Sequence, residues 1–413
     1  MVPLFKNAGF RRLWISQIML ALGGAAMQMG LLEVFRTHGY DVRVETAKFS
    51  FALAIPGLVL GPFAIAWLDR WQRRGVLIIS DAIRAVLVAG VVVWLLPLIT
   101  GRIEQRSLLA VYIAVGVIGA IATFYLPARS ALLPNLVEPG SLMKANALFA
   151  ASLAIATIGG SAVGGFVAER IGVTWAVSAN AVMYLASVIF LWRIRVDPHA
   201  SATSMTGIKK SGWGEFRIGM IYLWEHPSAM PLVILSGVFA FLLGILVVVF
   251  VGYAMKTLGL QTAGVGYLVA AGGIGAGAGI GLLGHGKPWT HSDWLPFAQL
   301  LLAAGALICL SLITNAWLAA PVVVVLGAVA ATVLIYIDAK LQTQVEDARR
   351  GAVFAARGAV TSATMCVAFG LQIWTVVLRQ TPAPTVLLWL GEGSIAAALL
   401  TVTMFLARRR QAQ

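Results

Sequence analysis

Long apolar runs recur from one end of this 413-residue chain to the other. Each run has about 20 residues or more, which lets a single helix cross a hydrocarbon layer of about 30 Å. Only 11% of the residues are charged, whereas a soluble domain carries roughly 25%. The runs are continuous and do not alternate with polar residues, which favours helices over a membrane β-barrel. The sequence therefore predicts an all-α membrane protein.

The number of runs predicts twelve transmembrane helices. The runs continue to the C-terminal end, so we do not expect a signal peptide followed by a soluble domain. The predicted spans are residues 13–35, 46–68, 75–98, 107–130, 142–168, 172–194, 229–255, 262–284, 294–313, 316–338, 350–378 and 384–407.

The chain has a net charge of +14, and its positive residues are distributed as expected for a chain that crosses a membrane twelve times. The two termini and the loops on their side of the membrane hold 20 of the 30 Lys and Arg residues, whereas the opposite loops hold 8. Cytoplasmic loops carry this excess of positive charge, so both termini are expected in the cytoplasm. The same distribution argues against a nucleic-acid partner.

The chain divides near its midpoint at a long polar interruption. We expect an N-terminal six-helix bundle over 1–194, a cytoplasmic linker over 195–228 and a C-terminal six-helix bundle over 229–413. Within the linker, four large apolar side chains recur at helical spacing and predict a helix lying flat at the membrane surface. They are Trp213, Phe216, Met220 and Trp224.

The two halves resemble each other in sequence. The fourth span ends in Tyr-Leu-Pro-Ala-Arg at 125–129, and the tenth ends in Tyr-Ile-Asp-Ala-Lys at 336–340, about half a chain later. Two similar six-helix bundles around a midplane cavity are the architecture of secondary transporters. A site between two rigid bundles opens to one side at a time, which indicates transport by rocking.

The loop between the second and third spans reads Ile-Ala-Trp-Leu-Asp-Arg-Trp-Gln-Arg-Arg at 65–74. It resembles the G-x-x-x-D-R-x-G-R-R loop of the major facilitator superfamily, with Ile65 and Gln72 in place of the glycines. The resemblance covers nearly the whole chain. The resemblance implies a cytoplasmic gate in which Asp69 of this loop pairs with the other half of the protein. It also implies that the partner is Arg357 in the eleventh span. The gate residues are Asp69, Arg70, Arg73 and Arg74; the alternative is a tight cytoplasmic turn with solvated charges.

The third span begins with Asp81 and Arg84, opposite charges on one face of a helix three residues apart. Such a pair forms readily on a helix, and charged groups inside a membrane are costly. We interpret the pair as a structural latch connected to the Asp69 turn, with a proton carrier as the alternative.

Glycines are concentrated in the fifth and eighth spans. Small residues let membrane helices approach closely, so Gly160, Gly164 and Gly165 are expected at a helix contact, as are Gly273 and Gly277. The fifth span also resembles the G-P-x-x-G-G motif of exporters in the superfamily, with Ser161 replacing the proline. No Gly-Lys-Ser/Thr follows the eighth span, which excludes a phosphate-binding loop.

Two branches of the superfamily carry similar segments. FRRLWISQ, LVLGPFAIAWLDRWQRR and YLPARSALLPNLVEP resemble the macrolide-efflux and enterobactin-exporter group. Lys-Ala-Asn-Ala-Leu at 144–148 resembles the bacterial lysophospholipid transporter.

Two further acids lie deep within predicted spans, Glu33 in the first and Glu392 in the twelfth. Desolvation lets a membrane carboxylate take up and release protons, so both are candidates for binding a proton or substrate. The alternative for Glu33 is an interfacial residue at the end of its span. In the family, the first and fourth spans line the cavity, so Gln28 and Tyr125 are also candidates for binding substrate or a proton. Few polar groups line such a cavity, which favours an amphipathic or hydrophobic solute.

The prediction is therefore a secondary active transporter, with proton-coupled efflux of small amphipathic or hydrophobic compounds as the leading hypothesis. A lysophospholipid transporter or flippase, or a siderophore or metal exporter, is the alternative. The histidines lack metal-ligand spacing and no Ser/His/Asp arrangement is visible, so we expect no metal, no cofactor and no enzyme activity. The resemblance implies a monomer in the bacterial inner membrane.

Overall fold

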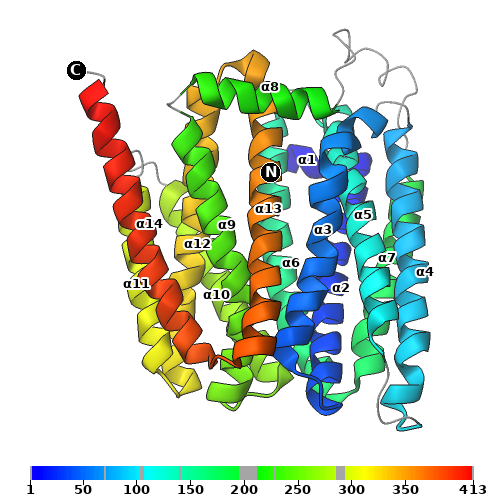
Figure 1. The fold of residues 1–413 in the computed structure, drawn as a ribbon. Helices are drawn as coiled ribbons and strands as arrows, with labels where there is room; N and C mark the ends of the chain where they lie inside the picture. Colours follow the sequence, from blue (N-terminus) through cyan, green and yellow to red (C-terminus); the bar gives the residue numbers. More distant parts are fainter. Residues whose placement is uncertain are drawn as a thin grey trace. The chain divides into compact units, whose positions relative to one another are not determined.

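The computed structural model describes residues 2–68, 71–102, 107–138, 141–194, 212–226, 229–284 and 294–411 (Figure 1). Helices make up almost all of these ranges, and no strand occurs in them. Twelve helices in this part of the chain are long and apolar enough to cross a membrane. The predicted all-α, twelve-span membrane protein is confirmed.

The helices fall into two compact units. Unit 1 comprises Met1–Tyr40 and Ala52–Gly214, and unit 2 comprises Asp41–Phe51 and Glu215–Gln413. The chain changes from one unit to the other inside the helix α3 (Val42–Leu68). The other helices of unit 1 are α1 (Val2–Lys6), α2 (Ala8–Thr37), α4 (Arg73–Ile99), α5 (Leu109–Leu132), the short η1 (Leu133–Leu136), α6 (Leu142–Arg170) and α7 (Val173–Trp192).

Unit 2 contains one short helix and six long ones. In the lipid interior a backbone must satisfy its own hydrogen bonds, which makes each apolar run a continuous helix. The helices are α8 (Gly212–Glu225), α9 (Met230–Gly252) with a π-helical extension η3 (Tyr253–Thr257), α10 (Thr262–Gly284), α11 (Leu295–Leu312), α12 (Ala316–Gln344), α13 (Asp347–Arg379) and α14 (Ala383–Gln411).

Local sequence signals set several helix ends. The Asn7 side chain caps α2 by accepting hydrogen bonds from the amides of Gly9 at 2.8 Å and Phe10 at 3.1 Å. Asn315 caps α12 in the same way. Asparagine is favoured at this position because its oxygen satisfies amides that have no partner within the helix. Gly172, with φ of 133°, makes the turn between α6 and α7 that a residue with a Cβ rarely adopts.

In unit 1, α2 lies against both α6 and α7, while α4 lies against α5 and α7. The contact between α2 and α6 depends on glycine. A Cβ added at Gly160 would lie 2.6 Å from the carbonyl oxygen of Leu22, and one at Gly164 would meet the backbone of Ala26. Gly165 is buried. These positions bring two helix backbones together as closely as small residues permit.

In unit 2, α10 lies against α12, α9 lies against α13, and α14 runs beside α11 (Figure 1). The contact between α10 and α12 is also made by glycine. A Cβ at Gly275 would meet the backbone of Val324, and one at Gly279 would lie 2.7 Å from the carbonyl oxygen of Ala328. Gly277 faces open space, and Gly273 is half-buried. The close approach in α10 is therefore made at positions neighbouring the two glycines selected from the sequence.

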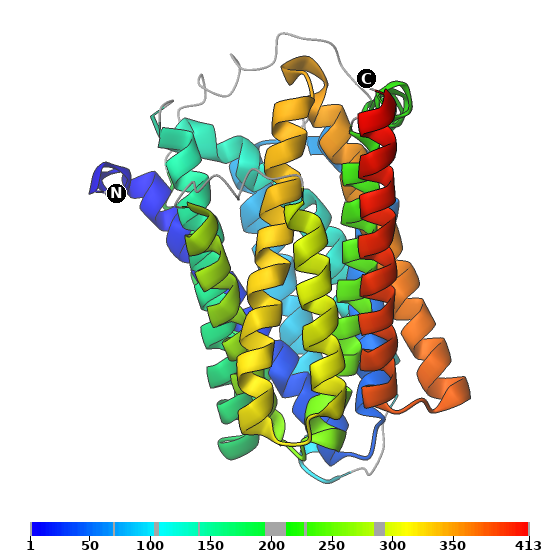
Figure 2. The ribbon, with the colours of Figure 1, turned by 90° about the vertical axis from the view of Figure 1, so that its left-hand side faces the viewer.

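The short helix α8 lies across the long helices α9 and α13 of the same unit (Figures 1 and 2). Leu223 is fully buried in the core beneath it, and a Cβ at Gly219 would meet the backbone of Ala352 in α13. Trp224 is 81% exposed on the opposite face. The rest of the expected linker, 195–211 and 227–228, lies outside the described residues, and the side chain of Trp213 is not described either.

Candidate functional site

Asp81 and Arg84 of α4 are charged residues buried in unit 1, with 0% and 5% of their surfaces exposed. Arg84 Nη1 lies 3.4 Å from Asp81 Oδ1, a long contact for an ion pair. The Ser187 hydroxyl of α7 donates a hydrogen bond of 2.6 Å to the other carboxylate oxygen. The spacing of three residues along one helix face therefore does place the two charges together.

The Arg84 guanidinium is incompletely hydrogen-bonded. Its Nε and Nη2 atoms are buried without a hydrogen-bond partner among the described residues. The Cζ atom lies 4.6 Å from the centre of the Tyr125 ring and 5.8 Å from that of Tyr184. Cation–π contacts offset part of the cost of burial, but unsatisfied buried N–H groups remain expensive.

Tyr125 extends this cluster toward the first span. Gln17 of α2 donates to the Tyr125 hydroxyl at 2.6 Å, and Arg129 of α5 donates to the Gln17 side-chain oxygen at 3.3 Å. We call the set Asp81, Arg84, Ser187, Tyr125, Tyr184, Gln17 and Arg129 the buried network. It links helices α4 and α7 to α2 and α5 through charged and polar side chains alone.

The sequence analysis did not select the α7 members of this network. A signal was present, because Asn180, Tyr184 and Ser187 recur at the spacing of one helix face inside an apolar run, and all three are buried. Asn180 faces α2, where its amide lies 3.1 Å from the sulfur of Met27. A polar stripe on one helix shows which residues share a face, but not which helix they meet.

Glu33 lies near the end of α2 and is 5% exposed. Arg36, one turn away, holds both of its carboxylate oxygens, with contacts of 2.6 Å and 2.9 Å. The Thr37 hydroxyl donates to the Glu33 carbonyl oxygen at 2.7 Å. Glu33 is thus a buried carboxylate in a two-point ion pair within its own helix, and Gln28 on the same helix is half-buried.

Glu392 lies on α14 of unit 2 and its side chain is exposed. It therefore does not belong to the buried network, whereas Tyr125 does. Among the described residues, no group of three or more His, Cys, Asp or Glu side chains is arranged to hold a metal ion.

The loop assigned to a gate is only partly described, because Asp69 and Arg70 lie outside the described residues. Arg73 donates to the carbonyl oxygen of Ala131 at 3.0 Å, and Arg74 donates to carbonyl oxygens at the end of α7. In unit 2, Arg357 forms an ion pair with Asp338 of α12. The pairing of Arg357 with Asp69 stays a prediction.

A second polar group lines a hollow of about 840 Å³ in unit 2. Lys256 at the end of η3 forms an ion pair of 3.3 Å with Asp41, which also accepts hydrogen bonds from the amides of Arg43 and Val44. Arg43 is 6% exposed and donates to the carbonyl oxygen of Thr381, while its Nε has no hydrogen-bond partner in the described part of the chain. The ion pair attaches the beginning of α3 to η3, and the Arg43 bond attaches it to the loop between α13 and α14.

The Asp41 ion pair makes stability depend on pH. Partial burial raises the pKa of the Asp41 carboxyl, but the Lys256 ammonium and the two amides outweigh burial and hold the pKa below its ordinary value. A lowered folded-state pKa stabilises the protein above the ordinary aspartate pKa of about 3.9, and this contribution is lost as pH falls through the folded value.

We therefore expect wild type to have a higher Tm than Asp41→Asn at pH 7, with the difference disappearing below about pH 4. The effect is small because the Asp41 and Lys256 side chains are 40% and 57% exposed. Thermal unfolding of the detergent-solubilised protein from pH 7 to pH 3 measures it. A difference that grew as pH fell would contradict the assignment.

Comparison with known proteins identifies the family of this architecture. The family model described as Major Facilitator Superfamily matches residues 13–369. The chain belongs to the Major Facilitator Superfamily. It is a multi-pass membrane transporter, and its described residues include twelve helices long and apolar enough to cross a membrane.

The chain is similar to several bacterial members of the superfamily. It is 29% identical to the MFS-type transporter Rv0037c of Mycobacterium tuberculosis over 87% of this chain and 82% of that protein. The putative bacilysin exporter BacE of Bacillus subtilis is 30% identical over 40% of this chain and 39% of its own length. The lysophospholipid transporter LplT of Photorhabdus laumondii is 24% identical over 55% of this chain and 52% of its own length. Several curated relatives are thus matched over little more than half of their length.

Among solved structures, the fold resembles the nucleoside transporter NupG with a TM-score of 0.75. The match covers 96% of this chain and 99% of that one at 14% sequence identity. At this level of identity the similarity concerns the fold alone.

Proposed function

We propose that this transporter is a proton-coupled exporter of small amphipathic or hydrophobic compounds, and that Asp81 and Arg84 are its coupling centre. It works by alternating access as a monomer in the bacterial inner membrane, with both termini in the cytoplasm. The observation that carries the proposal is the incompletely satisfied Asp81–Arg84 pair, buried in a membrane-spanning helix and continuous with Tyr125 and Gln17.

The bonding of the two buried acids favours Asp81 over Glu33 as the proton carrier. Both oxygens of Glu33 are held by short charge-assisted bonds to Arg36. The contact between Asp81 and Arg84 is 3.4 Å long, and two nitrogens of that guanidinium have no hydrogen-bond partner in the described residues. Neutralising Asp81 therefore breaks one long contact with an arginine, whereas neutralising Glu33 breaks two short ones.

Protonation of Asp81 would change the balance of charge in the buried network. With the carboxylate neutral, Arg84 loses its counter-charge and keeps only its contacts with the aromatic rings of Tyr125 and Tyr184. The buried network connects this change to α2 and α5, which carry the spans that line the cavity in the superfamily. A proton bound to Asp81 on α4 would thus change the polar groups that Gln17 and Tyr125 offer to a solute.

Export is the direction supported by the relatives and by the residues of the fifth span. BacE is named as an exporter, and GGSAVGG at 159–165 resembles the motif of exporting members. The scarcity of acids in the spans favours an amphipathic or hydrophobic solute over a sugar or phosphate. Gln28, Glu33 and Glu392 remain candidate substrate contacts in this proposal.

The test uses purified protein in liposomes with an acidic lumen, a lipophilic cationic dye as substrate and pyranine as the reporter of luminal pH. Wild type is expected to exchange dye for protons. Asp81→Asn is expected to lose dye-driven proton release at least about tenfold, because the carrier carboxylate is gone, while labelled dye still exchanges for unlabelled dye. Glu33→Gln is the matched control and is expected to keep proton release.

Two outcomes contradict the proposal. If Glu33→Gln loses coupling while Asp81→Asn retains it, the coupling centre is assigned to the wrong acid. If wild type moves no dye in response to the gradient, the exporter proposal fails.

The second candidate function is transport of lysophospholipid between leaflets. It is favoured by the similarity to LplT and by the Lys-Ala-Asn-Ala-Leu segment at 144–148. The same liposomes test it with a labelled lysophospholipid and no pH gradient. Movement of this lipid by wild type, together with no movement of dye, would replace the exporter proposal.

A further inference from the structure

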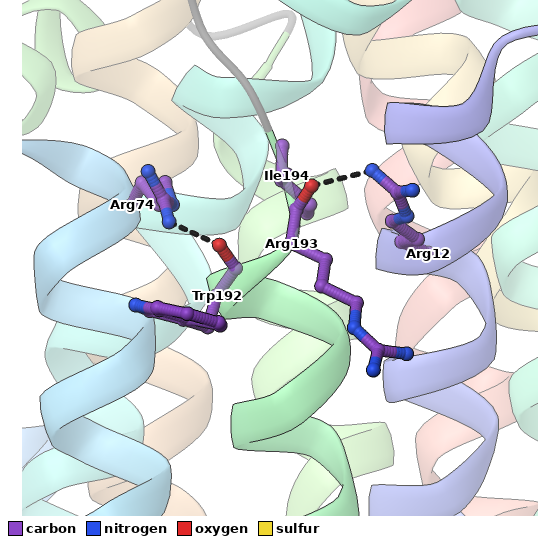
Figure 3. A pocket seen from close by; sticks show the side chains of 5 residues that line it. All are labelled: Arg12, Arg74, Trp192, Arg193 and Ile194. Carbon is purple, nitrogen blue, oxygen red and sulfur yellow. Dashed lines mark hydrogen bonds between the residues drawn. The ribbon is translucent and has the colours of Figure 1, made fainter.

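We infer that unit 1 carries a binding site for the phosphate head group of an anionic phospholipid, formed by Arg12, Arg74 and Arg193. The three side chains come from the beginning of α2, the beginning of α4 and the residue that ends α7 (Figure 3). They line a hollow of about 440 Å³, together with Trp192 and Ile194. The inference is independent of the proton-coupled export proposed above.

Two of the arginines are held in place by the end of α7. Arg12 donates to the carbonyl oxygen of Arg193, and Arg74 donates to those of Leu191 and Trp192. These carbonyls lie at the C-terminal, negative end of the helix dipole, which attracts cations. Each guanidinium has five N–H donors, so these bonds leave donors unused on both Arg12 and Arg74.

Bonds to the end of α7 explain the positions of Arg12 and Arg74 but not that of Arg193. The side chain of Arg193 extends from the end of α7 toward α2 (Figure 3), and the described part of the chain gives its guanidinium no hydrogen bond and no ion pair. No acid is among the described residues that line the hollow. Three cations around one hollow repel one another, and a bound anion would offset this repulsion.

The arginines that line the hollow favour a phosphate ligand. The position of the hollow at the ends of membrane-spanning helices favours a lipid as the source of that phosphate. Arginine forks match phosphate oxygens in geometry as well as in charge. The hollow lies where three membrane-spanning helices begin or end, on the side proposed to be cytoplasmic, where anionic lipids create a negative surface. Trp192 is 69% exposed at its edge, as is typical of tryptophan in the head-group layer.

The experiment is a native mass spectrometry titration of the full chain in detergent, first with phosphatidylglycerol and then with phosphatidylcholine. Wild type is expected to bind the first phosphatidylglycerol more tightly than phosphatidylcholine. Arg193→Gln removes a charge without removing a described bond. It is expected to weaken binding of the first phosphatidylglycerol molecule about fivefold. Arg193→Lys keeps the charge and is expected to recover part of the affinity.

The matched control is Arg11→Gln. Arg11 is an exposed cation beside Arg12 that donates to the carbonyl oxygen of Phe5 and does not line the hollow. It is expected to change phosphatidylglycerol binding less than about twofold, because it removes the same charge from the same end of α2 but not from the site. An unchanged Tm of Arg193→Gln in phosphatidylcholine verifies that the variant is folded.

Three results would overturn the inference. The first is equal binding of both lipids by wild type. The second is equal weakening of binding by Arg11→Gln and Arg193→Gln, which would indicate diffuse surface charge. Displacement of phosphatidylglycerol by millimolar glycerol phosphate, reduced in Arg193→Gln, would assign the site to soluble phosphates instead of lipid.

Discussion

Replacing Arg84 with glutamine is expected to lower the free energy of unfolding by about 3–5 kcal/mol. The substitution leaves Asp81, which is completely buried, without its positive partner. The hydrogen bond that Asp81 accepts from Ser187 stabilises a carboxylate less than a full positive charge does. The loss is measured by unfolding the protein in mixed detergent micelles.

A double-mutant cycle separates the charge interaction from simple loss of packing. Arg84→Gln combined with Asp81→Asn removes both charges, so we expect the double variant to recover most of the stability lost in Arg84→Gln. A loss in the double variant equal to the sum of the losses in Arg84→Gln and Asp81→Asn would show that the two charges do not interact. The cycle measures stability alone, so it is independent of the assignment of Asp81 as proton carrier.

Replacing Gly275 with alanine is expected to cost about 1–3 kcal/mol of stability, the usual penalty for overfilling a tightly packed contact. The new methyl group would meet the backbone of Val324, lying 2.6 Å from its carbonyl carbon, and a backbone cannot move aside as a flexible side chain can. The packing of α10 on α12 would have to loosen, which lowers the Tm in detergent.

Gly277→Ala is the matched control for this prediction. It makes the same chemical change in the same helix, two residues away, but an added Cβ there meets nothing within 4 Å. Since alanine favours a helix over glycine by about 1 kcal/mol, Gly277→Ala is expected to leave the Tm unchanged or to raise it. Similar losses at both positions would show that helix approach is not what Gly275 provides.

The two glycine clusters show how far a sequence pattern reaches. In α6, the pattern selected Gly160 and Gly164, and both face the backbone of α2. In α10, the same reasoning selected Gly273 and Gly277, whereas Gly275 and Gly279 make the close approach to α12. A span with glycine at many positions has several possible contact faces, and only the neighbouring helix decides which one is used.

The acidic residues give a similar lesson. Asp81 and Arg84 were recognisable as a pair because both lie on one turn of one helix. The pairing of Glu33 with Arg36 has the same spacing but was not foreseen, and it ties up the carboxylate that the sequence favoured as a proton site. The cluster of Asp41, Arg43 and Lys256 had no sequence signal, since Lys256 lies far along the chain from Asp41 and Arg43.

The sequence by itself determined that this chain has twelve membrane helices and belongs among the transporters of its superfamily. Both follow from local properties: the length of apolar run that a hydrocarbon layer requires, and a loop motif of neighbouring residues. Only the tertiary structure decided which polar side chains meet, such as Ser187 with Asp81 or Gln17 with Tyr125. The period of a helix assigns residues to a face, but the rotation of that helix and the identity of its neighbour depend on contacts between segments distant in the chain.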